Sequence, residues 1–136
     1  MRGRLGKLDT EVALLVDASN AFNTANRGKL IRTVAERVSA LGNAARNIYI
    51  YGSDLVLADG SRMRSAEGTT QGCPLAMQCF AISTLPLIAK TETADVEQEW
   101  YADDSAGVGT VKGACGWLRS LVLEGKDFGY SPASPG

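Results

Sequence analysis

The sequence predicts an α+β fold in which helices pack on one face of a small antiparallel sheet. Three observations lead to this expectation. Strand and helix patterns alternate along the 136 residues without a repeated strand–helix–strand period. Residues 96–110 have the pattern of two strands joined by a tight turn, which makes that pair antiparallel. Hydrophobic residues make up 45% of the chain, which is enough to build the core of one domain.

The first elements are expected to be a buried strand and a long helix. The apolar run before Asp17 predicts a strand that ends at this residue. A helix is expected to begin at a cap formed by Asn23 or Thr24 and to stop at Gly42. The evidence for it is a set of apolar residues at helical spacing, namely Leu30, Ile31, Val34, Val38 and Leu41.

The middle of the chain predicts a second helix, a hairpin and a third helix. The second helix covers about residues 44–51. The turn residues at 58–61 lie between two short runs and predict a β-hairpin. Pro74 suits the first turn of a helix, which runs to about Lys90. Because proline lacks an N–H group, this helix is expected to kink or end early near Pro86.

The last helix is expected over residues 112–124, with Gly125 as its stop and the tail 128–136 as a loop or frayed end. Its inward-facing residues are predicted to be Trp117, Leu118, Leu121 and Val122.

Asp103 and Asp104 place two adjacent carboxylates at the tip of the predicted hairpin of residues 96–110. Their mutual repulsion is explained if they bind Mg²⁺, which takes oxygen ligands and is held by one or two carboxylates. Asp17, at the end of its own strand, is the candidate third ligand. The alternative is an ordinary turn, since aspartate favours turns through its own hydrogen bonds.

Composition excludes several classes of site. The chain has no histidine, which excludes Ser-His and Cys-His catalysis within it. Its three cysteines form no CxxC pair, so neither a disulfide framework nor a zinc site is expected, and a reducing, intracellular setting fits best. The net charge of −1 gives no overall basic footprint for nucleic acid. The apolar stretch 73–89 is too short and too interrupted for a membrane span.

Three short segments of the sequence are informative because of their order and spacing along the chain. They are Leu-Leu-Val-Asp-Ala-Ser-Asn-Ala-Phe-Asn at 14–23, Thr-Thr-Gln-Gly-Cys-Pro-Leu at 69–75 and Trp-Tyr-Ala-Asp-Asp at 100–104. In this order and at these separations they resemble the palm motifs A, B and C of reverse transcriptases. The second and third segments are most similar to those of non-long-terminal-repeat retrotransposons and group II intron proteins.

This resemblance implies a polymerase palm formed by residues 1–24 and 71–127, partial fingers over 25–70 and a tail at 128–136. It implies an RNA-directed DNA polymerase that extends a DNA primer on an RNA template with deoxynucleoside triphosphates and two Mg²⁺ or Mn²⁺ ions. The upstream fingers strands and the thumb of the family are missing from the 136 residues, so the chain alone is expected to show little activity. An intracellular location is expected, and the sequence favours neither the nucleus nor the cytoplasm.

The resemblance also assigns roles to individual residues. Asp17 and Asp103 would bridge the two metal ions, with Asp104 as the neighbouring carboxylate. The backbone carbonyl of Ala18 would supply a further oxygen ligand beside the nucleotide.

Each of four more residues has both a role implied by the resemblance and an ordinary structural interpretation. Phe22 matches the aromatic residue that excludes a ribose 2′-hydroxyl, although a lone phenylalanine beside a strand end is usually a core residue. Gln71 and Gly72 match the pair that contacts the incoming nucleotide and the template, and they also belong to a helix-entry loop. Tyr101 would contact the primer terminus or else pack beneath the hairpin.

Two alternatives remain open at this point. One is a non-catalytic retroelement remnant that only binds nucleic acid or a partner protein. The other is a different palm-type two-metal enzyme such as a nucleotidyl cyclase, against which the Gln-Gly-Cys-Pro segment at 71–74 argues.

Overall fold

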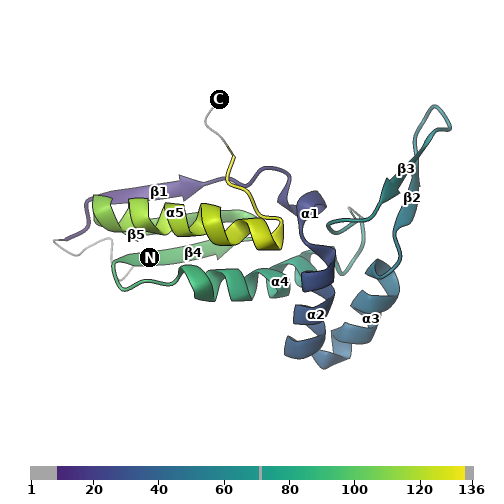
Figure 1. The fold of residues 1–136 in the computed structure, drawn as a ribbon, viewed down its shortest axis with the longest axis horizontal. Helices are drawn as coiled ribbons and strands as arrows, with labels where there is room; N and C mark the ends of the chain where they lie inside the picture. Colours follow the sequence, from purple (N-terminus) through teal and green to yellow (C-terminus); the bar gives the residue numbers. More distant parts are fainter. Residues whose placement is uncertain (1–8, 71, 134–136) are drawn as a thin grey trace. The chain divides into compact units, whose positions relative to one another are not determined.

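The computed structural model describes residues 9–70 and 72–133, and over these residues it is a mixed α/β structure (Figure 1). The elements in chain order are β1 (Val12–Val16), α1 (Ala21–Thr24), α2 (Arg27–Arg37), α3 (Ser39–Tyr49), β2 (Ser53–Val56), β3 (Arg62–Ser65), α4 (Ala76–Thr91), β4 (Val96–Tyr101), β5 (Asp104–Gly109) and α5 (Val111–Phe128). None of the helices in these ranges has the length and apolarity needed to span a bilayer.

The chain divides into two compact units. The first contains the residues up to Ser19 together with those from Leu85 onward, and the second is Asn20–Thr84. Helix α4 contributes its first part to the second unit and its last two turns to the first.

The first unit is built on an antiparallel sheet with the strand order β1–β5–β4. Val16 on β1 pairs with Ser105 on β5, and Ser105 pairs with Trp100 on β4. The expected strand before Asp17 and the expected hairpin of residues 96–110 are therefore both present. Strands β4 and β5 are joined by the two residues Ala102 and Asp103.

Helices cover one face of this sheet, as the fold class predicts. Side chains alternate along β4, so Val96, Gln98 and Trp100 share a face. The Gln98 side chain donates a hydrogen bond to the Ile88 carbonyl of α4 (2.9 Å) and accepts one from the Trp117 indole of α5 (3.1 Å). Both helices therefore contact the same side of β4.

Close packing of α5 requires a glycine in the central strand. Gly107 lies on the helix-facing side of β5, and a Cβ atom there would lie 2.7 Å from the Trp117 ring. The missing side chain lets the buried Trp117 indole lie directly against the sheet. Trp117 and Leu121 are buried as expected, whereas Val122 is exposed, which corrects its predicted inward position.

The second unit has its own core between α2 and α3. Leu30 and Val34 of α2 pack with Ala45 and Tyr49 of α3 and with Cys79 of α4. Hairpin β2–β3 forms at the predicted turn, and the side chains of both strands are largely exposed.

A buried arginine ties α2 to the loop that follows β3. The Arg27 guanidinium donates hydrogen bonds to the carbonyls of Ser65 (2.9 Å), Glu67 (2.8 Å) and Gly68 (2.9 Å) and lies over the Tyr49 ring. Because a buried cation is costly without such partners, these carbonyls explain why Arg27 is tolerated inside.

The predicted helix from residue 24 to Gly42 is wrong in its bounds. Asn26 caps α2 by accepting a hydrogen bond from the Lys29 amide (3.0 Å), and α2 ends before Val38. Gly42 lies inside α3. A Cβ atom at this position would come within 2.8 Å of the Ala35 Cα atom, so the close packing of α2 and α3 favours a glycine here. The glycine serves helix packing and does not stop a helix.

The later helices differ in part from their predicted bounds. Helix α4 begins two residues after Pro74 and continues through Pro86 to Thr91, so its predicted end near Lys90 is confirmed and the alternative of an early end near Pro86 is wrong. Gly125 lies within α5, and Gly129, with a φ of 71°, is the residue that ends the helix. The tail is not frayed over its described part, because Tyr130 is buried and Pro132 pairs with Ala18 in a β-bridge.

Candidate metal centre

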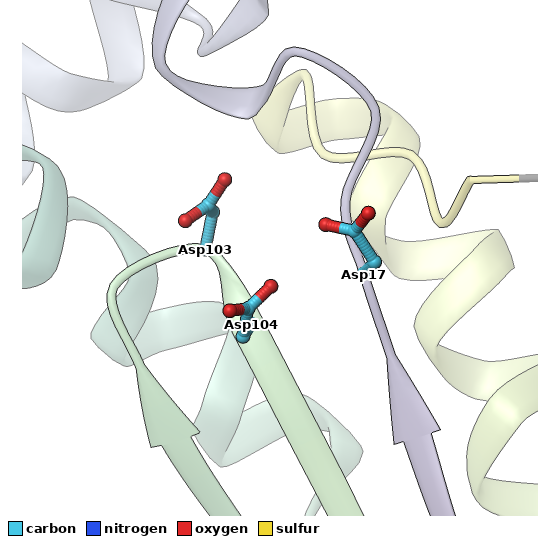
Figure 2. Close-up of side chains that lie close together, drawn as sticks. All are labelled: Asp17, Asp103 and Asp104. Carbon is cyan, nitrogen blue, oxygen red and sulfur yellow. The ribbon is translucent and has the colours of Figure 1, made fainter.

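Three carboxylates converge at one end of the sheet. Asp17 follows β1, whereas Asp103 and Asp104 lie at the β4–β5 turn, and their side chains project into the same space (Figure 2). Each offers a carboxylate oxygen, and these oxygens lie within 4.8 Å of one another. The convergence follows from the strand register. Because Val16 pairs with Ser105, Asp17, which follows Val16, lies beside Asp104, which precedes Ser105.

The turn that presents the acidic pair contains a strained residue. Ala102 has a φ of 54°, a left-handed conformation that costs an L-residue about 1–2 kcal/mol. Two-residue hairpin turns with a positive φ at the first central position normally have glycine there.

Ala102→Gly is therefore expected to raise the free energy of unfolding by about 0.5–1 kcal/mol, since relief of the strain exceeds the added chain entropy. Urea denaturation would measure the change as a shift in midpoint. Ala106→Gly, on β5 and without a positive φ, is the control and should destabilise by about 0.5–1 kcal/mol. Destabilisation by both substitutions would contradict the assignment of strain to Ala102.

The electrostatics of the cluster favour a cation. The pKa of the Asp104 carboxyl is raised above its ordinary value by partial loss of solvent and then by the negative charges of Asp103 and Asp17. Within residues 9–70 and 72–133, the three carboxylates form no ion pair with a lysine or arginine. An all-oxygen donor set of three carboxylates suits a hard divalent cation such as Mg²⁺ or Mn²⁺.

Ala18 and Tyr101 flank the acidic cluster. Ala18 is buried opposite Pro132, and the two hydrogen bonds of that bridge use the Asp17 carbonyl and the Ser19 amide. Neither of these two bonds uses the Ala18 carbonyl, which is the predicted metal ligand. The Tyr101 side chain is 81% exposed, so it does not pack beneath the hairpin, and its contact with a primer stays a prediction.

A hollow adjoins the carboxylates on the face of the sheet opposite the helices. Its volume is about 410 Å³, and its lining includes three acids, Asp17, Glu99 and Asp104. Leu15, which is 79% exposed, and Tyr101 give it an apolar lining. The arrangement places an apolar surface beside a cluster of negative charge.

The other predicted site residues belong to the second unit. Phe22 stacks on Phe80 with ring centroids 4.3 Å apart and is half-buried, so a packing role is present and the sugar-selecting role stays a prediction. Gly72 has a φ of 87°, which requires glycine, and no atom lies within 4 Å of the position of a Cβ. Gln71 lies outside the described residues.

Two residues of the first unit whose side chains join its elements were not singled out from the sequence. Gln98 accepts hydrogen bonds from the indoles of Trp100 (3.0 Å) and Trp117 (3.1 Å), and strand alternation between Val96 and Trp100 was a usable signal for its inward position. Tyr130 donates a hydrogen bond to the Asp103 carbonyl (2.9 Å) across 27 residues of sequence, for which no local pattern exists.

A comparison with solved structures agrees with this architecture. No protein-family model matches the chain, and no curated protein does. Among solved structures, the chain is similar to the apo telomerase from Candida tropicalis, truncated from its C-terminal domain, with a TM-score of 0.66 and 12% sequence identity. The match covers 91% of this chain and 31% of that telomerase chain. The chain therefore has a distant reverse-transcriptase-like fold and spans about a third of the matched telomerase.

Proposed function

We propose that this chain is the metal-binding core of an RNA-directed DNA polymerase of the non-long-terminal-repeat retrotransposon or group II intron type. The observation that carries the proposal is the convergence of Asp17, Asp103 and Asp104 from two separate segments. The reverse-transcriptase-like fold supports it, since telomerase is a reverse transcriptase-related polymerase.

The proposed chemistry is nucleotidyl transfer to a primer 3′-hydroxyl. Asp17, Asp103 and the Ala18 carbonyl would hold two divalent cations, with Asp104 adjusting the charge beside them. When bound, such a pair of cations activates the attacking hydroxyl and stabilises the charge of the reacting phosphate. The chain's own part is to keep the carboxylates close together before substrate arrives, so that little reorganisation is needed during the reaction.

The hollow beside the carboxylates would take the primer end. The apolar residues of its lining would contact the face of a sugar or base, and Asp17 and Asp104 would then lie next to the reacting hydroxyl. Tyr101, exposed at the rim, would contact this primer terminus. Leu15, on the same face, would add apolar contact area.

The second unit would bind the template strand. Arg32 and Arg46 border a groove of about 620 Å³ between α2 and α3, with Ile31 and Ile50 as apolar neighbours. None of the described residues that line this groove is acidic. Exposed guanidinium groups are suited to phosphates of the nucleic-acid backbone.

Mn²⁺ is expected to raise the melting temperature of the wild-type chain and to have little effect on Asp103→Asn. A cation that binds only the folded state at tenfold excess over its Kd stabilises it by about 1.4 kcal/mol. This corresponds to a rise of about 3–6 °C for a chain of this size. Differential scanning fluorimetry with and without Mn²⁺ measures the difference.

The variant also separates specific from general binding. Exposed acids elsewhere on the surface, such as Glu92 and Asp95, are unchanged in Asp103→Asn. An equal rise in both proteins would therefore show that Mn²⁺ binds at another place, and the proposed metal centre would be wrong.

A further inference from the structure

The segment of residues 130–133, called here the C-terminal strap, contacts both parts of the acidic cluster. Helix α5 ends at Phe128, and Gly129, with its positive φ, reverses the chain direction. The Tyr130 amide then donates to the Gly125 carbonyl (2.9 Å), which directs the strap back across the end of the sheet. The conformation of Gly129 thus determines where the strap begins.

The backbone of the strap holds the segment that bears Asp17. The Ala133 amide donates to the Asp17 carbonyl (2.8 Å), and the Ser19 amide donates to the Ser131 carbonyl (2.8 Å). The backbone of Asp17 is therefore held before it by the β1–β5 ladder, which ends at Val16, and after it by the bonds to the strap. An aspartate at a strand end would otherwise have a free carbonyl and a mobile backbone.

The side chain of Tyr130 holds the other part of the cluster. Its ring is 2% exposed and lies 5.4 Å from the Trp100 ring, and its hydroxyl donates to the Asp103 carbonyl (2.9 Å). Since the single hydroxyl proton is used there, the contact with Ser105 at 3.3 Å has Ser105 as the donor.

We propose that Tyr130 is a positioning residue of the metal centre, and that the C-terminal strap sets the separation of Asp17 and Asp103. This inference rests on the proposed function, because the separation matters only if the carboxylates share cations. One short segment bonds the backbone of both aspartates and so opposes the repulsion that would move their side chains apart. Groups that orient metal ligands in this way typically change metal affinity by about 10–100-fold when removed.

The test measures Mn²⁺ affinity of the full chain by electron paramagnetic resonance, which reports free Mn²⁺. Tyr130→Phe keeps the ring against Trp100 and removes only the hydroxyl; it is expected to weaken Mn²⁺ binding by about tenfold or more. Ser105→Ala is the matched control, because it removes the other hydrogen bond of the same hydroxyl and leaves the Asp103 bond intact. Its affinity is expected to stay within about threefold of wild type.

A second variant approaches the strap through its backbone. Ala133→Pro removes the amide that donates to the Asp17 carbonyl and leaves Tyr130 in place. It is expected to weaken Mn²⁺ binding in the same direction as Tyr130→Phe. Thermal melting without metal, measured in parallel, separates a loss of general stability from a loss of affinity.

Each outcome has a distinct meaning. Wild-type affinity in both strap variants, with binding lost in Asp103→Asn, would overturn the role of the strap and leave the metal centre standing. Equal weakening in Ser105→Ala and Tyr130→Phe would also overturn it, because the bond to Asp103 would then carry no special effect. If the wild-type chain bound no Mn²⁺, the proposed function would be wrong and the inference would fall with it.

Discussion

Asp103→Asn is expected to abolish primer extension, with a loss of about a thousandfold or more in rate. A bound cation contributes several kcal/mol of charge stabilisation in the transition state, and each 1.36 kcal/mol corresponds to about a factor of ten in rate. Asparagine keeps the size of the side chain and the backbone of the turn but removes one negative charge from the cluster. Binding of the primer–template is expected to remain near wild type, since the cation acts on the reacting phosphate.

The assay uses a chimera in which this chain replaces the corresponding core of a working reverse transcriptase, and extension of a DNA primer on RNA is followed by gel electrophoresis. Asp95→Asn is the matched control: Asp95 is exposed and lies next to the start of β4, at the opposite end of that strand from the turn. Extension at the wild-type rate by Asp103→Asn would show that the catalytic assignment is wrong.

Gln98→Met is expected to lower the free energy of unfolding by about 2–4 kcal/mol, because it leaves two indole N–H groups and one carbonyl without their partner. The Gln98 side-chain oxygen accepts from Trp100 and Trp117, and its amide donates to the Ile88 carbonyl, so one side chain joins α4, β4 and α5. Methionine has a similar volume and removes the polar contacts with little change in packing. Urea denaturation monitored by tryptophan fluorescence measures the loss.

Two further substitutions test this assignment. Gln78→Met makes the same change at an exposed glutamine on α4 and should alter stability by less than about 0.5 kcal/mol. Gln98→Glu keeps an acceptor oxygen but places a carboxylate oxygen against the Ile88 carbonyl, which raises the pKa of the new carboxyl in the folded state. Its stability should therefore be closer to wild type at acid pH and decrease as the pH rises. A loss in Gln98→Met no larger than that in Gln78→Met would contradict the role of Gln98.

The sequence by itself determined the elements that depend on local pattern. Strand β1, which ends before Asp17, follows from a short apolar run, and hairpin β4–β5 follows from period-two alternation around a turn. Both are encoded within a few neighbouring residues. The order of the motif segments was sufficient to predict that Asp17 would lie beside Asp103 and Asp104, and the three carboxylates do lie together.

Only the tertiary structure decided whether Gly42 and Pro86 end a helix, because packing competes there with the local preference of the residue. Gly42 lies within a helix where its local signal predicts a stop. The glycine is explained by packing, since the approach of Ala35 leaves no room for a side chain. Helix α4 passes through Pro86, with Phe80 and Leu87 buried on either side of it. The stability of these contacts exceeds the local preference of a single glycine or proline.

The tertiary structure also decided how the acidic cluster is supported. The tail sequence around Tyr130 contains proline and glycine, and such composition predicts a loop. In the fold, this loop bonds the backbones of Asp17 and Asp103, and both contacts span more than 25 residues of sequence. Hydrogen bonds of this kind leave no periodic trace in the sequence, because their geometry exists only after the sheet and α5 have packed.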